Sequence, residues 1–195
     1  MQEAGAEVDS KDKAGQTPLS HAAEHGHLEA VKWLVQEAWA EIHSKDKGGQ
    51  TPLGYAAKHG QLEAVKWLVQ EAGAEINSKD KGGQTPLSRA VEPGHLEVVK
   101  LLLEAGAGVD SKDKWRPLIW AAKNGHLEVV RQLVEEAGAN VESKDEDGGT
   151  LLSLAARNGH LEVVKWLVDG AGVDVHTKDK DGRTPLSRAA YCWKW

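Results

Sequence analysis

The stretch GQTPLGYAAKHGQLEAVKWL (residues 49–68) decides the fold, because near-copies of it recur along the whole chain. The leucine at the end of Thr-Pro-Leu, or at the matching position, marks each copy. Successive markers are separated by 34, 34, 31, 34 and 34 residues, and they are Leu19, Leu53, Leu87, Leu118, Leu152 and Leu186. A nearly constant step in this range indicates a solenoid of stacked units.

Composition bounds the class of protein. The chain has 195 residues, and because each unit of a solenoid packs only on its neighbours, we expect one elongated domain. Lys and Arg number 24 against 30 Asp and Glu, a net charge of −6 that argues against a general binder of phosphate backbones. The single cysteine, Cys192, excludes an intramolecular disulfide and a Cys-rich zinc module. Nucleic acid is therefore not an expected partner, and a reducing compartment is expected.

Targeting and membrane signals are missing from the sequence. Met1 is not followed by a basic and then an apolar run, so no secretory signal is expected. The longest apolar run is Leu118 to Ala122, far short of the roughly 20 residues that span a bilayer. We therefore expect a protein that is not secreted, does not enter membranes and lies in the cytoplasm or nucleus.

The sequence of each unit predicts a pair of helices. Thr17 before Pro18 is a helix start, since the hydroxyl accepts a backbone N–H and proline lacks one at the first helical position. A second helix follows Gly26, because the apolar side chains from Leu28 to Val35 repeat at helical spacing. Residues 40–50 are rich in glycine and charge, which favours an extended, hairpin-like connection.

The shared pattern Asp-Lys-x-Gly-x-Thr-Pro-Leu-x-x-Ala-Ala-x-x-Gly-His-Leu-Glu-x-Val-Lys-x-Leu resembles the ankyrin repeat over nearly the entire chain. Serine after Thr-Pro-Leu and Ser-Lys-Asp in the connections are similar to arrays common in filamentous fungi. The resemblance implies a mainly α fold, an ankyrin-repeat solenoid of stacked helix-turn-helix units with projecting β-hairpin-like fingers. It also implies protein binding on the concave face of first helices and finger tips, with no catalysis and no cofactor.

The repeat boundaries follow from the markers. Residues 1–11 match residues 69–79 and are expected to be the tail of a partial repeat. Neither end carries a cap, which leaves two alternatives open: a piece of a longer array, or a chain that associates with itself through its ends. The full repeats are expected at 12–45, 46–79, 80–112, 113–144 and 145–178, with a partial repeat at 179–195.

Some copies depart from the pattern. Trp39 stands where other units have the glycine expected at the left-handed end of the second helix. Repeat 4 lacks two finger residues, and Arg116 replaces the capping threonine, so its finger is expected to be short or distorted. In repeat 5, Leu151 replaces the proline, a tolerable local loss.

Residues that invite a catalytic or metal-binding interpretation recur with the repeat. His27, His95, His126 and His160 begin each second helix and are expected to be structural. His21 and His25 are four residues apart, but no third ligand accompanies them. Ser20 cannot pair with His21, since adjacent helical side chains point apart, and residues 47–50 lack the Gly-Lys-Ser/Thr of a phosphate loop. We expect neither an enzyme nor a metal site.

The tryptophans divide into two groups. Trp33, Trp67 and Trp166 occupy one slot in the second helices and are expected to pack side by side there. Trp115 and Trp120 belong to a finger and a first helix on the family's binding side. They are either binding hot spots or residues repacked around the shortened finger.

The finger tips differ in charge. Residues 11–13, 45–47, 79–81 and 112–114 each carry one net positive charge, whereas 144–147 is net negative. The first four fingers would therefore steer an acidic segment of a partner. We expect partner contacts from residues that vary between matched positions of the first helices and finger tips: Lys13, Gln16, His21, Glu24, His25, Lys47, Gln50, Tyr55, Lys58, His59, Lys81, Gln84, Arg89, Glu92, Lys114, Trp115, Trp120, Lys123, Asn124, Arg157, Asn158 and Arg183.

Overall fold

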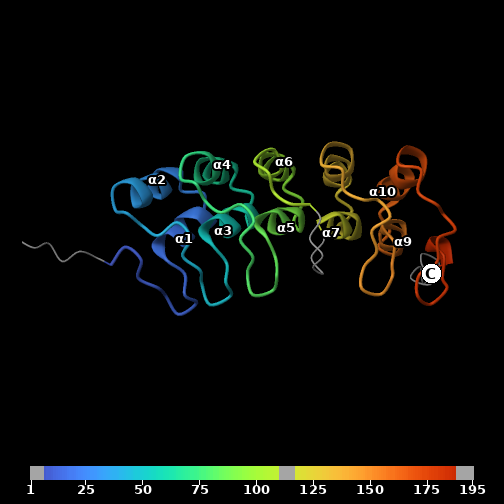
Figure 1. Ribbon diagram of the computed structural model, residues 1–195, viewed down its shortest axis with the longest axis horizontal. Coiled ribbons are helices and arrows are strands. Elements are labelled where there is room, and N and C mark those ends of the chain that lie inside the picture. Colours follow the sequence, from blue (N-terminus) through green and yellow to red (C-terminus); the bar gives the residue numbers. More distant parts are fainter. Residues whose placement is uncertain (1–6, 110–116, 188–195) are drawn as a thin grey trace, which may run out of the picture. The chain divides into compact units, whose positions relative to one another are not determined.

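A computed structural model describes residues 7–109 and 117–187, and these residues are mainly helical (Figure 1). Backbone contacts divide the chain into two compact units. Unit 1 comprises Met1–Ala90 and Glu97–Gly108, and unit 2 comprises Val91–Leu96 and Val109–Trp195. In the described part of the chain, no helix is long and apolar enough to cross a membrane.

Unit 1 holds the helices of repeats 1 and 2 and most of those of repeat 3. In Figure 1, the first helices α1 and α3 lie side by side, and the second helices α2 and α4 form a row above them. The helices are α1 (Pro18–Glu24), α2 (Leu28–Gln36), α3 (Pro52–Lys58), α4 (Leu62–Gln70), α5 (Pro86–Val91) and α6 (Leu96–Glu104).

Unit 2 repeats the arrangement with one difference. Its first helices α7 and α9 contact each other, and each second helix passes from α-helical into π-helical turns before it ends. The elements are α7 (Pro117–Asn124), α8 (Leu127–Arg131), η1 (Gln132–Glu136), α9 (Leu151–Arg157), α10 (Leu161–Lys165) and η2 (Trp166–Gly170).

The predicted helix starts are confirmed. Thr17 and Thr51 have extended backbones, and their hydroxyls accept the N–H three residues later at 3.3 and 3.2 Å. Thr150 caps α9 in the same way at 3.2 Å although leucine replaces the proline after it. The threonine, and not the proline, is therefore sufficient to start this helix.

The left-handed end of the second helix is confirmed too. Gly73, Gly138 and Gly172 have φ of 72°, 67° and 65°. Trp39 adopts the same conformation with φ of 59° and is the one non-glycine residue with positive φ in the described part of the chain.

The fingers are hairpin-like loops closed by backbone hydrogen bonds. The Asp12 N–H donates to the Gln16 carbonyl at 3.0 Å, and Asp46 and Gln50 repeat this bond at 3.1 Å. Neighbouring fingers are tied by the Lys47 N–H, which donates to the Ala14 carbonyl at 3.0 Å. The described residues form no extended strand, and their one β-bridge joins Lys144 and Thr150. The predicted distortion of the repeat 4 finger falls largely on residues 110–116, outside the described residues.

The core is a ladder of equivalent side chains. The marker leucines Leu19, Leu53, Leu87, Leu118 and Leu152 are buried at one position of successive repeats. Burying a leucine contributes about 1.5–3 kcal/mol, so each marker leucine stabilises the repeat that holds it. Small side chains next to the leucines let the helices approach, and the buried ones include Ala22, Ala23, Ala56, Ala57, Ala90, Ala121, Ala122 and Ala155.

The recurring histidines join successive repeats, which confirms their structural role at two positions. His126 Nε2 lies 3.0 Å from the Glu92 carbonyl, and His160 Nε2 lies 2.9 Å from the Lys123 carbonyl. Gln61 replaces the histidine in repeat 2 and donates its amide to the Glu24 carbonyl at 3.0 Å. Because a carbonyl only accepts, Nε2 of both histidines carries the proton.

One packing prediction is wrong. Trp67 and Trp166 are half-buried, but 59% of Trp33 is exposed, so Trp33 does not pack between second helices. Among the described residues, no second helix precedes α2 for its indole to contact.

Candidate functional site

An aspartate folds each finger tip that the structure describes. In repeat 1, Asp12 Oδ1 accepts the N–H groups of Ala14 and Gln16 at 2.8 and 2.9 Å. In repeat 5, Asp145 Oδ1 accepts those of Asp147 and Gly149 at 3.0 and 2.6 Å. Short polar side chains favour this local closure of a turn. One carboxylate oxygen is thus committed to the finger, and Oδ2 remains for another partner.

In repeats 1 to 3, that partner is the side chain nine residues later, in the first helix. Three different residue types serve as the donor. His21 Nε2 lies 3.1 Å from Asp12 Oδ2, and the Tyr55 hydroxyl donates to Asp46 Oδ2 at 2.7 Å. Arg89 Nη2 forms an ion pair with Asp80 Oδ2. We call this bond from first helix to finger the latch.

The latch shifts the pKa values of the residues that form it. Burial, and then the hydrogen bond to Asp46, raises the pKa of the Tyr55 hydroxyl well above its usual value. The Gln16 N–H, and after it the His21 side chain, hold the pKa of Asp12 below its usual value. In unit 1, the variable first-helix position therefore stabilises the repeat itself.

Repeat 5 has lost the latch. Leu154 stands nine residues after Asp145, is buried and has no donor. No described side chain donates to Asp145 Oδ2. Instead, a hollow of about 420 Å³ opens between α7, α9 and the finger of repeat 5.

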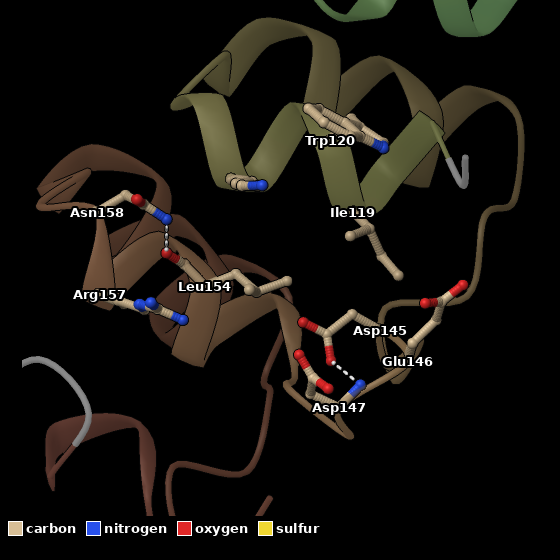
Figure 2. A pocket seen from close by; sticks show the side chains of 9 residues that line it. Ile119, Trp120, Asp145, Glu146, Asp147, Leu154, Arg157 and Asn158 are labelled. Atoms are coloured by element: carbon tan, nitrogen blue, oxygen red, sulfur yellow. Dashed lines mark hydrogen bonds between the residues drawn. The ribbon is translucent and has the colours of Figure 1, made fainter. Parts of the chain in front are cut away.

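The walls of the hollow combine apolar and charged groups (Figure 2). Helix α7 contributes Trp120, with Lys123 Nζ 4.6 Å from the centre of its ring. Helix α9 contributes Arg157, and Asn158, the residue that caps its end, donates to the Leu154 carbonyl at 2.8 Å. All of its lining residues belong to unit 2, and they are Ile119, Trp120, Lys123, Asp145, Glu146, Asp147, Leu154, Arg157 and Asn158.

The hollow therefore brings together four residues predicted from the sequence: Trp120, Lys123, Arg157 and Asn158. The acidic wall of Asp145, Glu146 and Asp147 is not among the contacts predicted from the sequence, where these residues give only a net negative finger tip. The signal in the sequence was the leucine at 154, where repeats 1 to 3 have the hydrogen-bond donors His21, Tyr55 and Arg89 nine residues after the finger aspartate.

The other predicted contacts are dispersed, and several are engaged within the protein. Glu24 accepts from Gln16 Nε2 at 3.2 Å and lies 3.4 Å from His59 Nε2. Asn124 donates to the Glu92 carbonyl at 3.2 Å. Exposed positions among the predicted set, apart from those of the hollow, are Lys13, His21, His25, Lys47, Lys58, His59, Lys81, Glu92 and Arg183.

Two predicted contact residues need correction, and two cannot be placed. Gln50 and Gln84 are only 8% and 7% exposed, so their side chains lie in the finger bases and not on the surface. The Gln50 side chain packs on helix α3, since its Cγ lies next to Gly54. Lys114 and Trp115 lie outside the described residues.

Groups considered for catalysis are committed to structure. Ser20, Ser88 and Ser153 are buried, and the Ser20 hydroxyl lies 3.2 Å from that of Thr17. His25 Nδ1 lies 2.9 Å from the His21 carbonyl. Over the ranges 7–109 and 117–187, no group of three or more His, Cys, Asp or Glu side chains is placed to hold a metal ion.

Comparison with known families agrees with this architecture. A family model described as ankyrin repeats (3 copies) matches residues 1–80, 72–145 and 118–193. The chain belongs to the ankyrin-repeat family. Proteins of this family are generally protein–protein interaction modules and are typically not catalytic. No curated protein shows a significant match to the sequence.

Proposed function

We propose that the chain is a non-catalytic scaffold that binds another protein through its first helices and finger tips, with the hollow of unit 2 as the main contact. The observation that carries this proposal is the contrast between repeats. The same positions that form latches in repeats 1 to 3 open into a hollow of about 420 Å³ in repeat 5.

The composition of the hollow supports a protein partner. Protein interfaces concentrate their binding energy in aromatic and arginine side chains surrounded by polar groups. Trp120 and Arg157 supply these side chains, and Asn158 and the finger carboxylates supply the polar surroundings. Exposed Lys13, Lys47 and Lys81 would attract acidic parts of the same partner to the finger tips of unit 1.

The test is capture of partners from the source cell, followed by titration of the purified partner by calorimetry. Alanine at both Trp115 and Trp120 should weaken binding by at least about tenfold, which corresponds to about 1.4 kcal/mol. Lys66→Ala, an exposed change on the second helix α4 and outside the predicted contacts, serves as the control. Unchanged binding by the double tryptophan variant would remove the hollow from the interface.

A second candidate function is self-association, and one observation favours it. In the described part of unit 2, an apolar hollow of about 600 Å³ includes Leu161, Val175 and Leu186, which are 59%, 40% and 79% exposed. Exposed apolar surface of this kind marks interaction sites. A second copy of the chain would cover it by stacking one array on another.

A further inference from the structure

The missing latch in repeat 5 leaves a carboxylate oxygen without the donor that its counterparts have. Asp12, Asp46 and Asp80 show what this oxygen binds when the first helix supplies a donor: an imidazole, a phenol and a guanidinium. In repeat 5, Asp145 keeps the same finger geometry through Oδ1. Its Oδ2 is thus presented in the way that the other repeats present theirs to a donor.

We propose that the hollow binds an arginine side chain of a partner protein, with its guanidinium on Asp145 Oδ2 in place of the absent latch donor. This inference rests on the proposed protein-binding function and adds the chemistry of the partner. The partner segment would carry the arginine among small or apolar residues, since Leu154 and Ile119 form part of the wall.

The ion pair of Arg89 and Asp80 shows how the protein can bind the arginine of a partner. The Arg89 guanidinium pairs with Asp80 while 21% of the Arg89 side chain and 4% of the Asp80 side chain remain exposed. The finger and first helix can therefore enclose an arginine beside this carboxylate. Arginine suits the site better than lysine, because its planar group bonds carboxylates in a fixed geometry and stacks on aromatic rings such as that of Trp120.

The charge around the hollow favours a cation. Asp145, Glu146 and Asp147 outnumber Lys123 and Arg157 among its lining residues. Figure 2 shows the carboxylates of Asp145 and Asp147 next to each other on the finger. A cation placed there reduces the repulsion between them.

Neither basic residue of the hollow takes the place of the partner's arginine at Asp145. Lys123 Nζ lies over the Trp120 ring. Among the described residues, no carboxylate oxygen lies within 4.0 Å of the Arg157 guanidinium. Arg157, three residues after the latch position Leu154 in α9, therefore does not replace the latch. Because Arg157 lines the same hollow and has the same charge, the partner's arginine must bind away from it or displace it.

The experiment is a titration of the full chain, labelled with ¹⁵N, with the peptide acetyl-Gly-Leu-Arg-Leu-Gly-amide. The matched ligand replaces arginine with citrulline, which keeps the shape and removes the charge. We expect saturable shifts at the amides of Asp147, Gly149 and Leu154, and an affinity at least about tenfold higher for the arginine peptide. Equal affinities for the two peptides, or no saturable binding, would overturn the inference.

Two variants separate the carboxylate from the fold. Leu154→Arg introduces a latch like that of Arg89. We expect it to lower the affinity for the arginine peptide by about tenfold or more. Asp145→Asn keeps an oxygen for the Asp147 and Gly149 N–H groups and removes the charge. It should therefore lower the affinity for the arginine peptide as much as Leu154→Arg does, without unfolding the finger. Asp12→Asn, whose Oδ2 already has a partner in unit 1, is the control and should bind as the wild type does.

A third ligand distinguishes this inference from the broader function. If the corresponding glutamate peptide binds in the hollow and Arg157→Ala abolishes that binding, the hollow takes an acidic partner and the arginine assignment is wrong. Protein binding would then still stand, because it is tested separately by the capture of partners and the tryptophan variant.

Discussion

At the scale of single residues, Trp39 has an unfavourable backbone conformation that no burial of its side chain offsets. Its φ is 59°, and 83% of its surface is exposed, so its indole buries little area that could offset the strain. The left-handed conformation costs an L-residue roughly 1–2 kcal/mol, whereas glycine adopts it readily.

Trp39→Gly should therefore stabilise the protein by about 1 kcal/mol. The free energy of unfolding from urea denaturation is the measurement. Gly73→Ala is the reciprocal control, because a Cβ at Gly73 would meet no atom within 4 Å and only the conformational term changes. Gly73→Ala should destabilise by a similar amount, and a less stable Trp39→Gly variant would contradict the interpretation.

Tyr55 makes stability depend on pH at the alkaline end. Its pKa is raised in the folded protein, so its contribution is fully present below the unfolded pKa of about 10 and is lost as the pH rises toward the folded pKa. The free energy of unfolding should fall above about pH 10, and Tyr55→Phe should remove part of that slope. Tyr191→Phe is the control for the other tyrosine of the chain, and an identical slope in Tyr55→Phe would refute the assignment.

At the scale of elements, one extra residue lies at the end of the second helix in every repeat except repeat 3, including repeats 1 and 2, whose second helices have no π-helical turns. From the first leucine of the second helix to the left-handed residue, repeat 3 has 10 steps (Leu96 to Gly106), and repeat 4 has 11 (Leu127 to Gly138). In repeat 3, the Ala107 N–H bonds the Leu102 carbonyl at 2.9 Å, as in a compact helix end. That bond spans five residues, whereas in repeat 4 the equivalent N–H, that of Ala139 after Gly138, reaches back six residues to the Leu133 carbonyl at 2.8 Å.

Removing that residue should restore a regular helix end. Deleting Glu136 gives repeat 4 the spacing of repeat 3, and we expect stabilisation of about 1 kcal/mol, the net value of one good hydrogen bond. Thermal unfolding of the full chain measures it. Deletion of Glu104 from repeat 3 is the control and should destabilise, because that helix has no extra residue to lose. Destabilisation by both deletions would contradict this account.

At the scale of the whole molecule, the apolar hollow at Leu161 predicts association. Leu161→Lys places a charge in that surface and should lower the average mass seen by light scattering at high protein concentration. Trp33→Lys is the matched control, since Trp33 has the same exposed fraction of 59% in unit 1. A wild-type chain that stays monomeric across the concentration series would exclude self-association.

The sequence by itself determined the repeat, the capping threonines, the left-handed slot at Trp39 and the histidines that join repeats. These features depend on a few adjacent residues or on contacts repeated in every unit, so they appear as a periodic pattern. It also predicted four residues of the hollow but could not tell them from exposed residues elsewhere.

Only the tertiary structure decided which variable residues are available to a partner. Tyr55 and Arg89 form latches, Gln50 and Gln84 are buried, and Leu154 leaves Asp145 without a donor. The physical reason is that the latch forms only when the finger folds back onto the first helix and two side chains nine residues apart meet. Whether that meeting satisfies a carboxylate or opens a hollow depends on the pair of residues together, which no single position in the sequence records.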